Sequence, residues 1–315
     1  MDSEIASLKV NNTWTLTSKP PEANVIPCKW VFRVKTNPDG SIIDKYKARL
    51  VVKGFSQRAG VDYKQNFSPV AKMGTIRSIP VIAASEKMSL TQFDVSTAFL
   101  YGDLDEKIYI RQPEGYGDGS NKVCLLQKNL YGLKQAPRCW NKRFGNFLSR
   151  LRFRKSEADP CLFIRESNGL KLILVLYVDD GLIAASDKED LKKFLQDLQA
   201  EFKITSKDAS YFLGVEIKQT EKGVKISQEA YAKKILQPFG MEDCKPVSTP
   251  IVKKGSTPRD DTVNKAKEPQ MEVNGRKIPY REAIGTLMMY LMLGSRPDLA
   301  LCIGMLSRSL ESASY

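Results

Sequence analysis

The feature that most constrains this chain is a pair of adjacent carboxylates inside an apolar stretch. Asp179 and Asp180 interrupt the run Leu172-Ile-Leu-Val-Leu-Tyr-Val-Asp-Asp-Gly-Leu-Ile-Ala-Ala185. Two neighbouring charges are costly there unless a positive partner holds them. A divalent metal ion is the partner we consider, because a strand that ends in Asp-Asp and continues as a second strand presents both carboxylates from a hairpin. A plain turn explains these residues equally well, since Asp180-Gly181 is itself a favoured hairpin dipeptide.

Composition narrows the chemistry further. The 315 residues include no histidine, which excludes mechanisms built on an imidazole base or an imidazole metal ligand. The 49 Lys and Arg residues exceed the 36 Asp and Glu residues, giving a net charge of +13. This surplus favours a polyanionic partner, nucleic acid first, through release of counterions from phosphates. Charge alone also fits a basic protein that is merely soluble.

Cysteine usage and hydrophobicity indicate a globular, intracellular chain. The six cysteines show no C-x-x-C pair and no framework spacing, so they are interpreted as reduced thiols. The N-terminal residues do not resemble a secretory leader, and no apolar run approaches the ~18 residues of a membrane span. We therefore expect no membrane partner.

A basic stripe is predicted on a long hairpin over residues 28–53. Apolar and basic residues alternate before the turn sequence Asn37-Pro-Asp-Gly40 and again after it. On the return strand, period-two alternation places Lys45, Lys47 and Arg49 on one face. Tyr46, Ala48, Leu50 and Val52 lie on the other face and are expected to anchor the stripe. A solvated hairpin face is the alternative.

The remaining chain alternates helical and extended patterns without an internal repeat. Pro80 lies inside the first predicted helix, where a proline costs ~3 kcal/mol or forces a kink. A polar stretch, Lys253–Lys277, is predicted to be a linker. Helices are expected over 75–88, 139–151, from the capping box Ser186-Asp-Lys-Glu189 to Phe202, 280–293 and 298–310, and strands over 90–100, 211–218 and 223–226.

Asp94 is the natural third carboxylate for a metal site. It lies in Gln92-Phe-Asp-Val-Ser-Thr-Ala-Phe99, at the end of a predicted strand. A lone Asp at such a position is more often a helix N-cap than a ligand. Together with Asp179, Asp180, the basic stripe and the missing histidines, it suggests two metal ions that activate a hydroxyl and stabilise a leaving pyrophosphate. That chemistry is nucleotidyl transfer.

The motifs resemble the reverse transcriptase domain of copia-type long-terminal-repeat retrotransposons. The resemblance covers nearly the whole chain, and many blocks occur in the family's order. They are Asn12-Thr-Trp14, Lys29-Trp-Val-Phe-Arg-Val-Lys35, Lys47-Ala-Arg-Leu-Val-Val-Lys-Gly54, Phe93-Asp-Val-Ser-Thr-Ala-Phe-Leu-Tyr-Gly102, Leu130-Tyr-Gly-Leu-Lys-Gln-Ala-Pro-Arg138, Tyr177-Val-Asp-Asp180, Tyr211-Phe-Leu-Gly214 and Arg296-Pro-Asp298.

The resemblance implies catalytic and substrate-binding roles. Asp94, Asp179 and Asp180 would bind two Mg²⁺ ions, with Mn²⁺ as the alternative, and Asp180 is the least certain direct ligand. Phe99 would select deoxynucleotides by clashing with a ribose 2′-hydroxyl, although a plain core aromatic is the better interpretation by residue type. The remaining implied roles are a triphosphate grip at Lys47 and Arg49, support of the templating base and nucleotide at Tyr131 and Gly132, and a primer grip at Phe212, Leu213 and Gly214.

The implied fold is α+β, a right-hand polymerase with an antiparallel palm sheet. Fingers would occupy 1–74 and 104–138, the palm 75–103 and 139–224, and a truncated helical thumb 225–315. The implied partners are an RNA or DNA template-primer and deoxynucleoside triphosphates, in a cytoplasmic virus-like particle with a nuclear phase. Because no ribonuclease H, protease or integrase segment is recognisable, the chain is interpreted as a polyprotein fragment or truncated genomic copy.

Three residues depart from the family's usual pattern, and two alternative hypotheses remain. Tyr131 replaces the glutamine of many other reverse transcriptases, while Pro80 and Gly181 are expected to loosen their surroundings. A catalytically silent, nucleic-acid-binding remnant is therefore the competing hypothesis. A metal nuclease or integrase is poorer, because no separated acidic triad with a Glu emerges.

Overall fold

The computed structural model describes residues 1–36, 43–220, 223–249, 271–273, 276–278, 280–288 and 294–308. Contacts divide the chain into two compact units, Met1–Ala209 and Ser210–Tyr315. The first unit contains the long hairpin, the Asp-Asp segment and most of the buried core. Helices and strands mix in both units, and the largest described sheet is antiparallel, which is consistent with the expected α+β class. The predicted boundaries of fingers, palm and thumb stay predictions.

A six-stranded sheet carries the Asp-Asp segment. Its strand order is β12-β5-β11-β10-β9-β8, and every neighbouring pair is antiparallel. The central strands β10 and β11 are buried on both faces, which explains why their sequences are nearly continuous apolar runs. The strands are β5 (Ser89–Val95), β8 (Arg154–Lys155), β9 (Leu162–Ser167), β10 (Leu170–Tyr177), β11 (Asp180–Ala185) and β12 (Ile204–Asp208).

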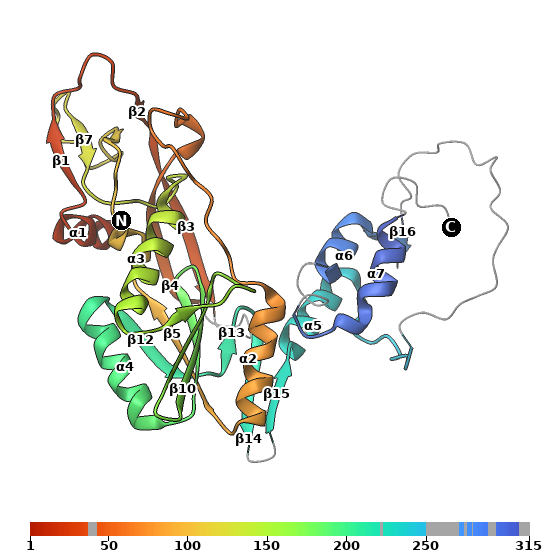
Figure 1. Ribbon diagram of the computed structural model, residues 1–315. Helices are drawn as coiled ribbons and strands as arrows, with labels where there is room; N and C mark the ends of the chain where they lie inside the picture. The colour runs from red at the N-terminus through yellow and green to blue at the C-terminus, as the bar shows by residue number, and fades with distance from the viewer. Residues whose placement is uncertain are drawn as a thin grey trace. The chain divides into compact units, whose positions relative to one another are not determined.

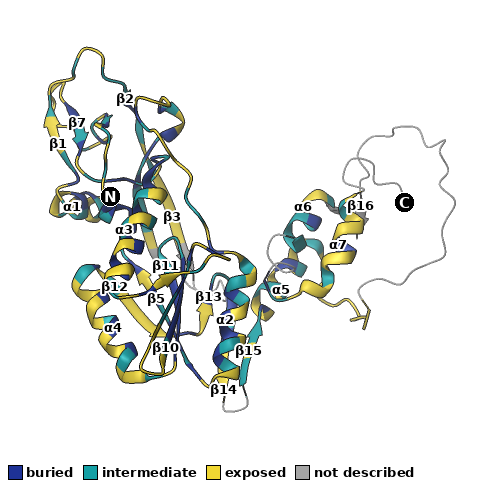
Figure 2. Ribbon diagram, viewed as in Figure 1, coloured by how far each residue is buried: buried dark blue, intermediate teal, exposed yellow. Residues whose placement is uncertain are grey.

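Helices cover both faces of this sheet (Figure 1). Helices α3 (Ala136–Arg150) and α4 (Lys188–Glu201) pack on Leu172, Leu174 and Leu176 of β10 within one core cluster. Alternation along β10 turns Ile173 and Val175 to the opposite face, where α2 (Met73–Ser85) contacts β5, β10 and β11. Figure 2 shows the buried residues concentrated on the strands between these helices.

A second sheet and a long hairpin complete the first unit. The four-stranded sheet has the order β1-β7-β6-β2, with β2 and β6 parallel, and the hairpin pairs β3 with β4. The short helical segments are α1 (Asp2–Val10), η1 (Gly54–Ser56) and η2 (Ala98–Tyr101). The strands are β1 (Trp14–Thr17), β2 (Val25–Ile26), β3 (Cys28–Thr36), β4 (Ile43–Val52), β6 (Tyr109–Ile110) and β7 (Val123–Leu126).

The second unit begins with a small antiparallel sheet in the order β13-β14-β15. Its strands are β13 (Tyr211–Phe212), β14 (Val215–Thr220) and β15 (Gly223–Ser227). The elements after them are α5 (Glu229–Leu236), η3 (Gln237–Phe239), β16 (Met271–Val273), β17 (Arg276–Ile278), α6 (Tyr280–Thr286), η5 (Pro297–Leu299) and α7 (Ala300–Ser307). Within the described parts of both units, no helix is long and apolar enough to cross a membrane.

Several local predictions need correction. Helix α2 continues through Pro80, which is buried, so the proline does not end the helix. The cap of α4 is Asp187, whose side chain accepts from the backbone N–H of Asp190, whereas the predicted cap Ser186 accepts from the Lys171 amide. Much of the predicted linker lies outside the described residues, but its end forms the antiparallel pair β16–β17.

The predicted hairpin is present as β3–β4, but its apolar anchor is shorter than expected. Leu50 and Val52 are buried at its base, whereas the Tyr46 side chain is 75% exposed. The predicted anchoring face is therefore buried only near the main body of the unit. Lys47 and Arg49 lie two residues apart on β4, while the Lys45 side chain lies outside the described residues.

Candidate active site

A two-residue turn at the end of β10 positions the Asp-Asp pair. Tyr177 pairs with Asp180 across β10 and β11, so Val178 and Asp179 form the turn. The hypothesis that Asp180-Gly181 is the turn is wrong, because both residues belong to β11. Val178 has a φ of +59°, which is costly for a β-branched residue, of the order of 1–3 kcal/mol. The surrounding structure must therefore hold this turn in place.

Two hydrogen bonds hold the turn from different elements. The indole Nε1–H of Trp140, on α3, donates to the carbonyl of Val178 at 2.6 Å. The backbone N–H of Val95, on β5, donates to the carbonyl of Asp179 at 2.8 Å. Sequence reasoning placed Trp140 only on the apolar stripe of its helix. The available signal was that a buried tryptophan requires a hydrogen-bond acceptor for its ring nitrogen.

Strand β5 brings the third carboxylate to the same end of the sheet. Asp94 is the register partner of Asp180 across β5 and β11. Asp94 is exposed, while Asp179 and Asp180 are half-buried. The N-cap alternative for Asp94 is wrong, because the following helical turn η2 begins at Ala98 and Thr97 is its N-cap. The three predicted carboxylates are thus carried by the paired strands β5 and β11 and by the turn that joins β10 to β11.

Gly181 is a site of close packing. It pairs with Phe93 across β5 and β11, and a Cβ added to Gly181 would lie 2.1 Å from the Phe93 ring. Both residues are buried. The absent side chain lets an aromatic ring lie over the backbone beside Asp180. The structure thus gives Gly181 a packing role, and the expected loosening there stays a prediction.

Three of the predicted nucleotide-binding residues form a stack. The Tyr131 ring lies 4.6 Å from the Phe99 ring, centroid to centroid, at an interplanar angle of 59°. The Arg49 guanidinium carbon lies 4.7 Å from the Tyr131 centroid. Phe99 itself is 8% exposed and belongs to the main core cluster. The stack joins β4, η2 and the loop before α3, which are distant in the sequence.

Electrostatics link this stack to the carboxylates. Burial raises the pKa of Tyr131 to about 12, and the negative charges of Asp179 and Asp94 contribute to the same shift. The positive charge of Arg49 opposes it. The Tyr131 hydroxyl therefore lies within electrostatic reach of both carboxylates and stays protonated near neutral pH.

Two glycines allow the backbones beside the stack to touch. The Val52 amide donates to the Tyr131 carbonyl at 2.8 Å. Gly132 has a φ of +95°, and a Cβ there would lie 2.0 Å from the Val52 carbonyl oxygen. A Cβ on Gly54 would lie 2.0 Å from the Gly132 carbonyl oxygen. Gly132 thus has a backbone role that fits its predicted place beside Tyr131.

A buried polar network braces the same loop, and sequence reasoning missed it. Gln57 Nε2 donates to Gln135 Oε1 at 2.9 Å, and Gln135 Nε2 donates to the Asp62 carbonyl at 2.9 Å. Gln57 Oε1 accepts from the Lys134 amide at 2.8 Å. Gln57 and Gln135 are buried, and so is Asp62, which contributes its backbone carbonyl. No periodicity signals such a network, because its members lie far apart in sequence.

The predicted primer-grip residues belong to the second unit. Phe212 is buried at the end of β13, and Leu213 and Gly214 form the turn to β14 with φ values of +49° and +82°. The predicted triphosphate residue Lys47 is half-buried on β4, opposite Arg33. The roles of these residues remain predictions.

The donor set suits a hard divalent cation. Among the described residues, no group of three or more His, Cys, Asp or Glu side chains is arranged to hold a metal ion by itself. Magnesium is usually bound through one or two carboxylates together with substrate phosphates and water, and seldom by an all-protein cage. The oxygen-only set Asp94, Asp179 and Asp180 therefore fits an ion that the substrate helps to bind.

Comparison with known proteins gives consistent matches. A family model described as reverse transcriptase (RNA-dependent DNA polymerase) matches residues 11–253. The chain is similar to the retrovirus-related Pol polyprotein from transposon TNT 1-94 of Nicotiana tabacum, with 42% identity over 99% of the chain and 24% of that protein. The corresponding polyprotein from transposon RE2 of Arabidopsis thaliana is 37% identical over 98% of the chain and 21% of its own length.

A shorter relative is matched over a larger share of its own length than the two plant polyproteins are. A putative transposon Ty5-1 protein of Saccharomyces cerevisiae is 31% identical over 69% of each protein. The chain thus spans about a quarter or less of the two plant polyproteins. The resemblance to copia-type elements is confirmed.

Proposed function

The chain belongs to the reverse transcriptase (RNA-dependent DNA polymerase) family, and on this premise we propose that it extends a primer 3′-hydroxyl with deoxynucleotides on an RNA or DNA template. One observation carries the proposal. Asp94 and Asp180 are register partners at the end of the sheet where Asp179 forms the turn, and the charges of Asp179 and Asp94 act on Tyr131, whose ring packs against Arg49. Because the chain spans only part of the plant polyproteins, we propose that it is the polymerase segment of a longer Pol protein.

Asp94, Asp179 and Asp180 are the residues that would hold two Mg²⁺ ions, for which Mn²⁺ is the natural replacement. Bound there, the ions would lower the pKa of the primer hydroxyl and neutralise charge on the phosphates. The carboxylates are exposed or half-buried and reach the surface from a rigid sheet. Their fixed positions would orient the substrate for attack on the α-phosphate.

Arg49 and Lys47 would bind the triphosphate. Arg49 presents several N–H donors in a planar fork, and the Tyr131 ring beneath it limits the orientations that the guanidinium adopts. Lys47 would supply a second positive charge two residues away on β4. Both residues would act by binding and orienting the phosphates, with no proton transfer.

Tyr131 and Phe99 would shape the nucleotide pocket. Because the pKa of Tyr131 is about 12, its hydroxyl is a hydrogen-bond donor near neutral pH. The Phe99 ring packs against Tyr131, so its position is constrained, as a residue that excludes a ribose 2′-hydroxyl requires. Phe212, Leu213 and Gly214 would hold the primer, a role that rests on the resemblance alone.

Primer extension tests the proposal. With oligo(dT) on poly(rA) and Mg²⁺, the wild-type chain should incorporate dTMP, and Asp179→Asn should reduce incorporation at least ~100-fold. Asp197→Asn makes the same chemical change at an exposed position of α4 and should leave incorporation unchanged. Template binding by the Asp179→Asn protein should persist.

Equal background incorporation by the wild-type and Asp179→Asn proteins, with template binding retained, would refute the proposed activity. That outcome would favour the silent nucleic-acid-binding remnant.

A further inference from the structure

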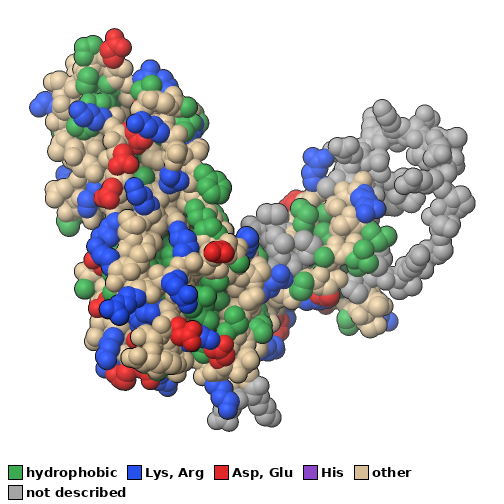
Figure 3. Space-filling view, viewed as in Figure 1, with side chains coloured by type: hydrophobic (Ala, Val, Ile, Leu, Met, Phe, Trp, Pro, Cys, Tyr) green, Lys and Arg blue, Asp and Glu red, His purple; other side chains and the backbone are tan. Residues whose placement is uncertain are grey.

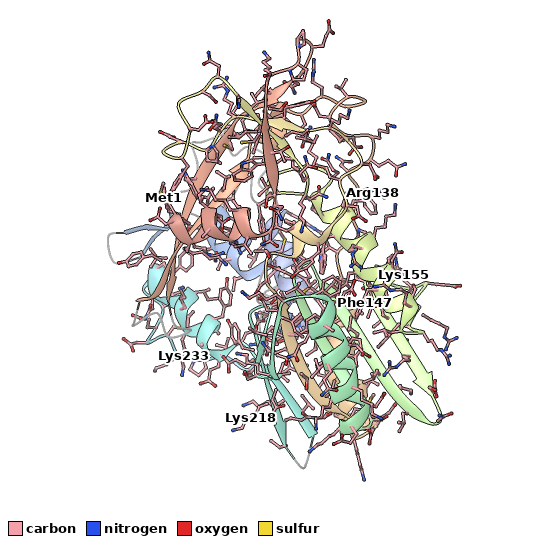
Figure 4. All side chains as sticks on the ribbon, turned by 90° about the vertical axis from the view of Figure 1, so that its left-hand side faces the viewer. Met1, Arg138, Phe147, Lys155, Lys218 and Lys233 are labelled. Atoms are coloured by element: carbon pink, nitrogen blue, oxygen red, sulfur yellow. The ribbon has the colours of Figure 1, made fainter. Side chains whose placement is uncertain are left out.

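A positively charged depression lies at one end of the four-stranded sheet in the first unit. Its volume is about 510 Å³, which suits a nucleotide-sized group. Lys19, Arg111 and Lys122 line it, and no carboxylate does. These residues lie near the end of β1, after β6 and before β7, where the paired strands bring them together. Figure 3 shows Lys and Arg side chains over this part of the unit, with some Asp and Glu side chains among them.

None of the three cations has a carboxylate partner among the described residues of this unit, residues 1–36 and 43–209. All three side chains are exposed. The only carboxylate that the described loop places beside them is Asp118, which interacts electrostatically with Lys122 and already accepts hydrogen bonds within the loop. Three like charges beside one carboxylate still repel each other, and a bound anion relieves that repulsion. The depression therefore favours a negatively charged ligand.

The loop that forms the wall is braced from within. Gln112 Oε1 accepts from the Asp118 amide at 2.9 Å, and Gln112 Nε2 donates to the Asp118 carboxylate at 2.8 Å and to the Lys122 carbonyl at 3.1 Å. Asp118 Oδ1 also accepts from the Ser120 amide at 2.9 Å and its hydroxyl at 2.6 Å. The Ser120 and Gln112 hydrogen bonds hold the pKa of Asp118 at about 2, so this carboxylate is ionised and already engaged by the loop.

Alternate amides of this loop are left available. The N–H groups of residues 118, 120 and 122 donate to acceptors inside the loop. Those of Gly117, Gly119 and Asn121, which line the depression, have no acceptor in the described part of the chain. Unpaired backbone N–H groups can donate to an anion, and the two glycines allow an anion to approach the backbone closely.

We propose that Lys19, Arg111, Lys122 and the 117–121 loop bind phosphate groups of a single-stranded nucleic acid, at a place separate from the catalytic carboxylates. The choice of nucleic acid among phosphate-bearing ligands rests on the proposed function. The shared chemistry is phosphate recognition, and a free nucleotide is the other possible source. The depression admits one or two nucleotides of a strand, which then continues over the surface.

Binding of a fluorescein-labelled single-stranded 30-mer, measured by anisotropy at several salt concentrations, tests the proposal. The triple variant Lys19→Gln/Arg111→Gln/Lys122→Gln should lower the slope of log affinity against log salt by about 2, because single strands give about 0.7 per phosphate contact. At about 0.1 M salt, the affinity should fall roughly 10- to 100-fold.

Two further variants distinguish the loss of this binding site from a general loss of positive charge. Lys188→Gln/Lys192→Gln/Lys193→Gln removes three exposed lysines from α4, so the total charge change is the same and the slope should stay close to wild type. Gln112→Ala keeps every cation but removes the hydrogen bonds that brace the loop. It should weaken binding, while the slope of log affinity against log salt stays close to wild type. Circular dichroism confirms that each variant is folded.

Three outcomes would overturn the proposal: an unchanged slope in the first triple variant, an equal loss in the α4 variant, or a loss seen only with free dTTP as ligand. Primer extension at saturating template tests the catalytic proposal separately. The Lys19→Gln/Arg111→Gln/Lys122→Gln variant should keep the wild-type maximal rate in that assay. A failure of the binding proposal can therefore be distinguished from a failure of the catalytic proposal.

Discussion

Gly181→Ala should destabilise the sheet beside the catalytic turn, although alanine usually suits a strand better than glycine. The new Cβ would lie 2.1 Å from two atoms of the Phe93 ring, far inside contact distance. Forcing a methyl group into a packed site costs about 1–3 kcal/mol, and the lower chain entropy of alanine returns about 0.5–1 kcal/mol. Because the Phe93 ring is buried and the overlap is large, we place the cost at about 2–3 kcal/mol, which leaves a net loss of about 1–2.5 kcal/mol.

Urea unfolding of the full chain measures this loss. Gly74→Ala is the matched control, because Gly74 lies in α2 with nothing within 4 Å of its Cβ position. Replacement there should stabilise the chain by up to about 1 kcal/mol. The two glycine-to-alanine changes should thus have opposite signs.

A double-mutant cycle identifies the responsible contact. In a Phe93→Leu background the ring is gone, so Gly181→Ala should be nearly neutral, and the coupling energy should reach at least about 1 kcal/mol. If Gly181→Ala costs the same with Phe93 and with Leu at that position, the Phe93 ring is not the cause. A neutral or stabilising Gly181→Ala in the wild-type background would refute the packing argument itself.

Two further predictions concern single hydrogen-bonding residues of the first unit, Trp140 beside the catalytic turn and Asp159 at the start of α2. Trp140→Phe removes the donor to the Val178 carbonyl and should cost about 1–3 kcal/mol in urea unfolding, with a lower maximal rate of primer extension; unchanged stability and rate would contradict a bracing role. Burial opposes ionisation of Asp159, but hydrogen bonds from Thr75, Lys72 and Cys161 outweigh it and hold its pKa below the usual 3.8. Its stabilisation should therefore be present above about pH 3.8 and be lost as pH falls through the lower folded-state pKa. Asp159→Asn should flatten the acid side of the stability curve, and parallel curves for the two proteins would contradict this.

The sequence was most informative where chemistry and periodicity agreed. Two adjacent carboxylates in an apolar run, with turn residues before a second run, predicted the hairpin of β10 and β11. Alternation along residues 45–52 likewise predicted which residues share a face of β4. In both segments the side-chain period of a strand is two, so a pattern of single residues determines the face.

Local rules failed where a tertiary contact decided the outcome. An Asp-Gly pair favours a turn, yet Asp180 and Gly181 extend β11, because β5 pairs with both and Phe93 occupies the space above the glycine. Strand pairing with β5 therefore outweighed the turn propensity of the Asp-Gly pair. The positive φ of Val178 was also unforeseen, since the residue type disfavours it and only contacts from α3 and β5 hold the turn.

The aromatic stack was beyond sequence reasoning for a different reason. Its residues Arg49, Phe99 and Tyr131 are separated by about fifty and about thirty positions, and no spacing rule connects them. The resemblance to a known family named all three, but their mutual contact required the structure.

The most direct measurement of the central claim is single-nucleotide incorporation on an RNA template by Asp94→Asn. Asp187→Asn, at the N-cap of α4, is the control, because asparagine also caps helices. If Asp94 and the Asp179-Asp180 turn form one catalytic site, Asp94→Asn should abolish Mg²⁺-dependent incorporation while Asp187→Asn retains it. Wild-type incorporation by the Asp94→Asn protein would contradict the proposed site.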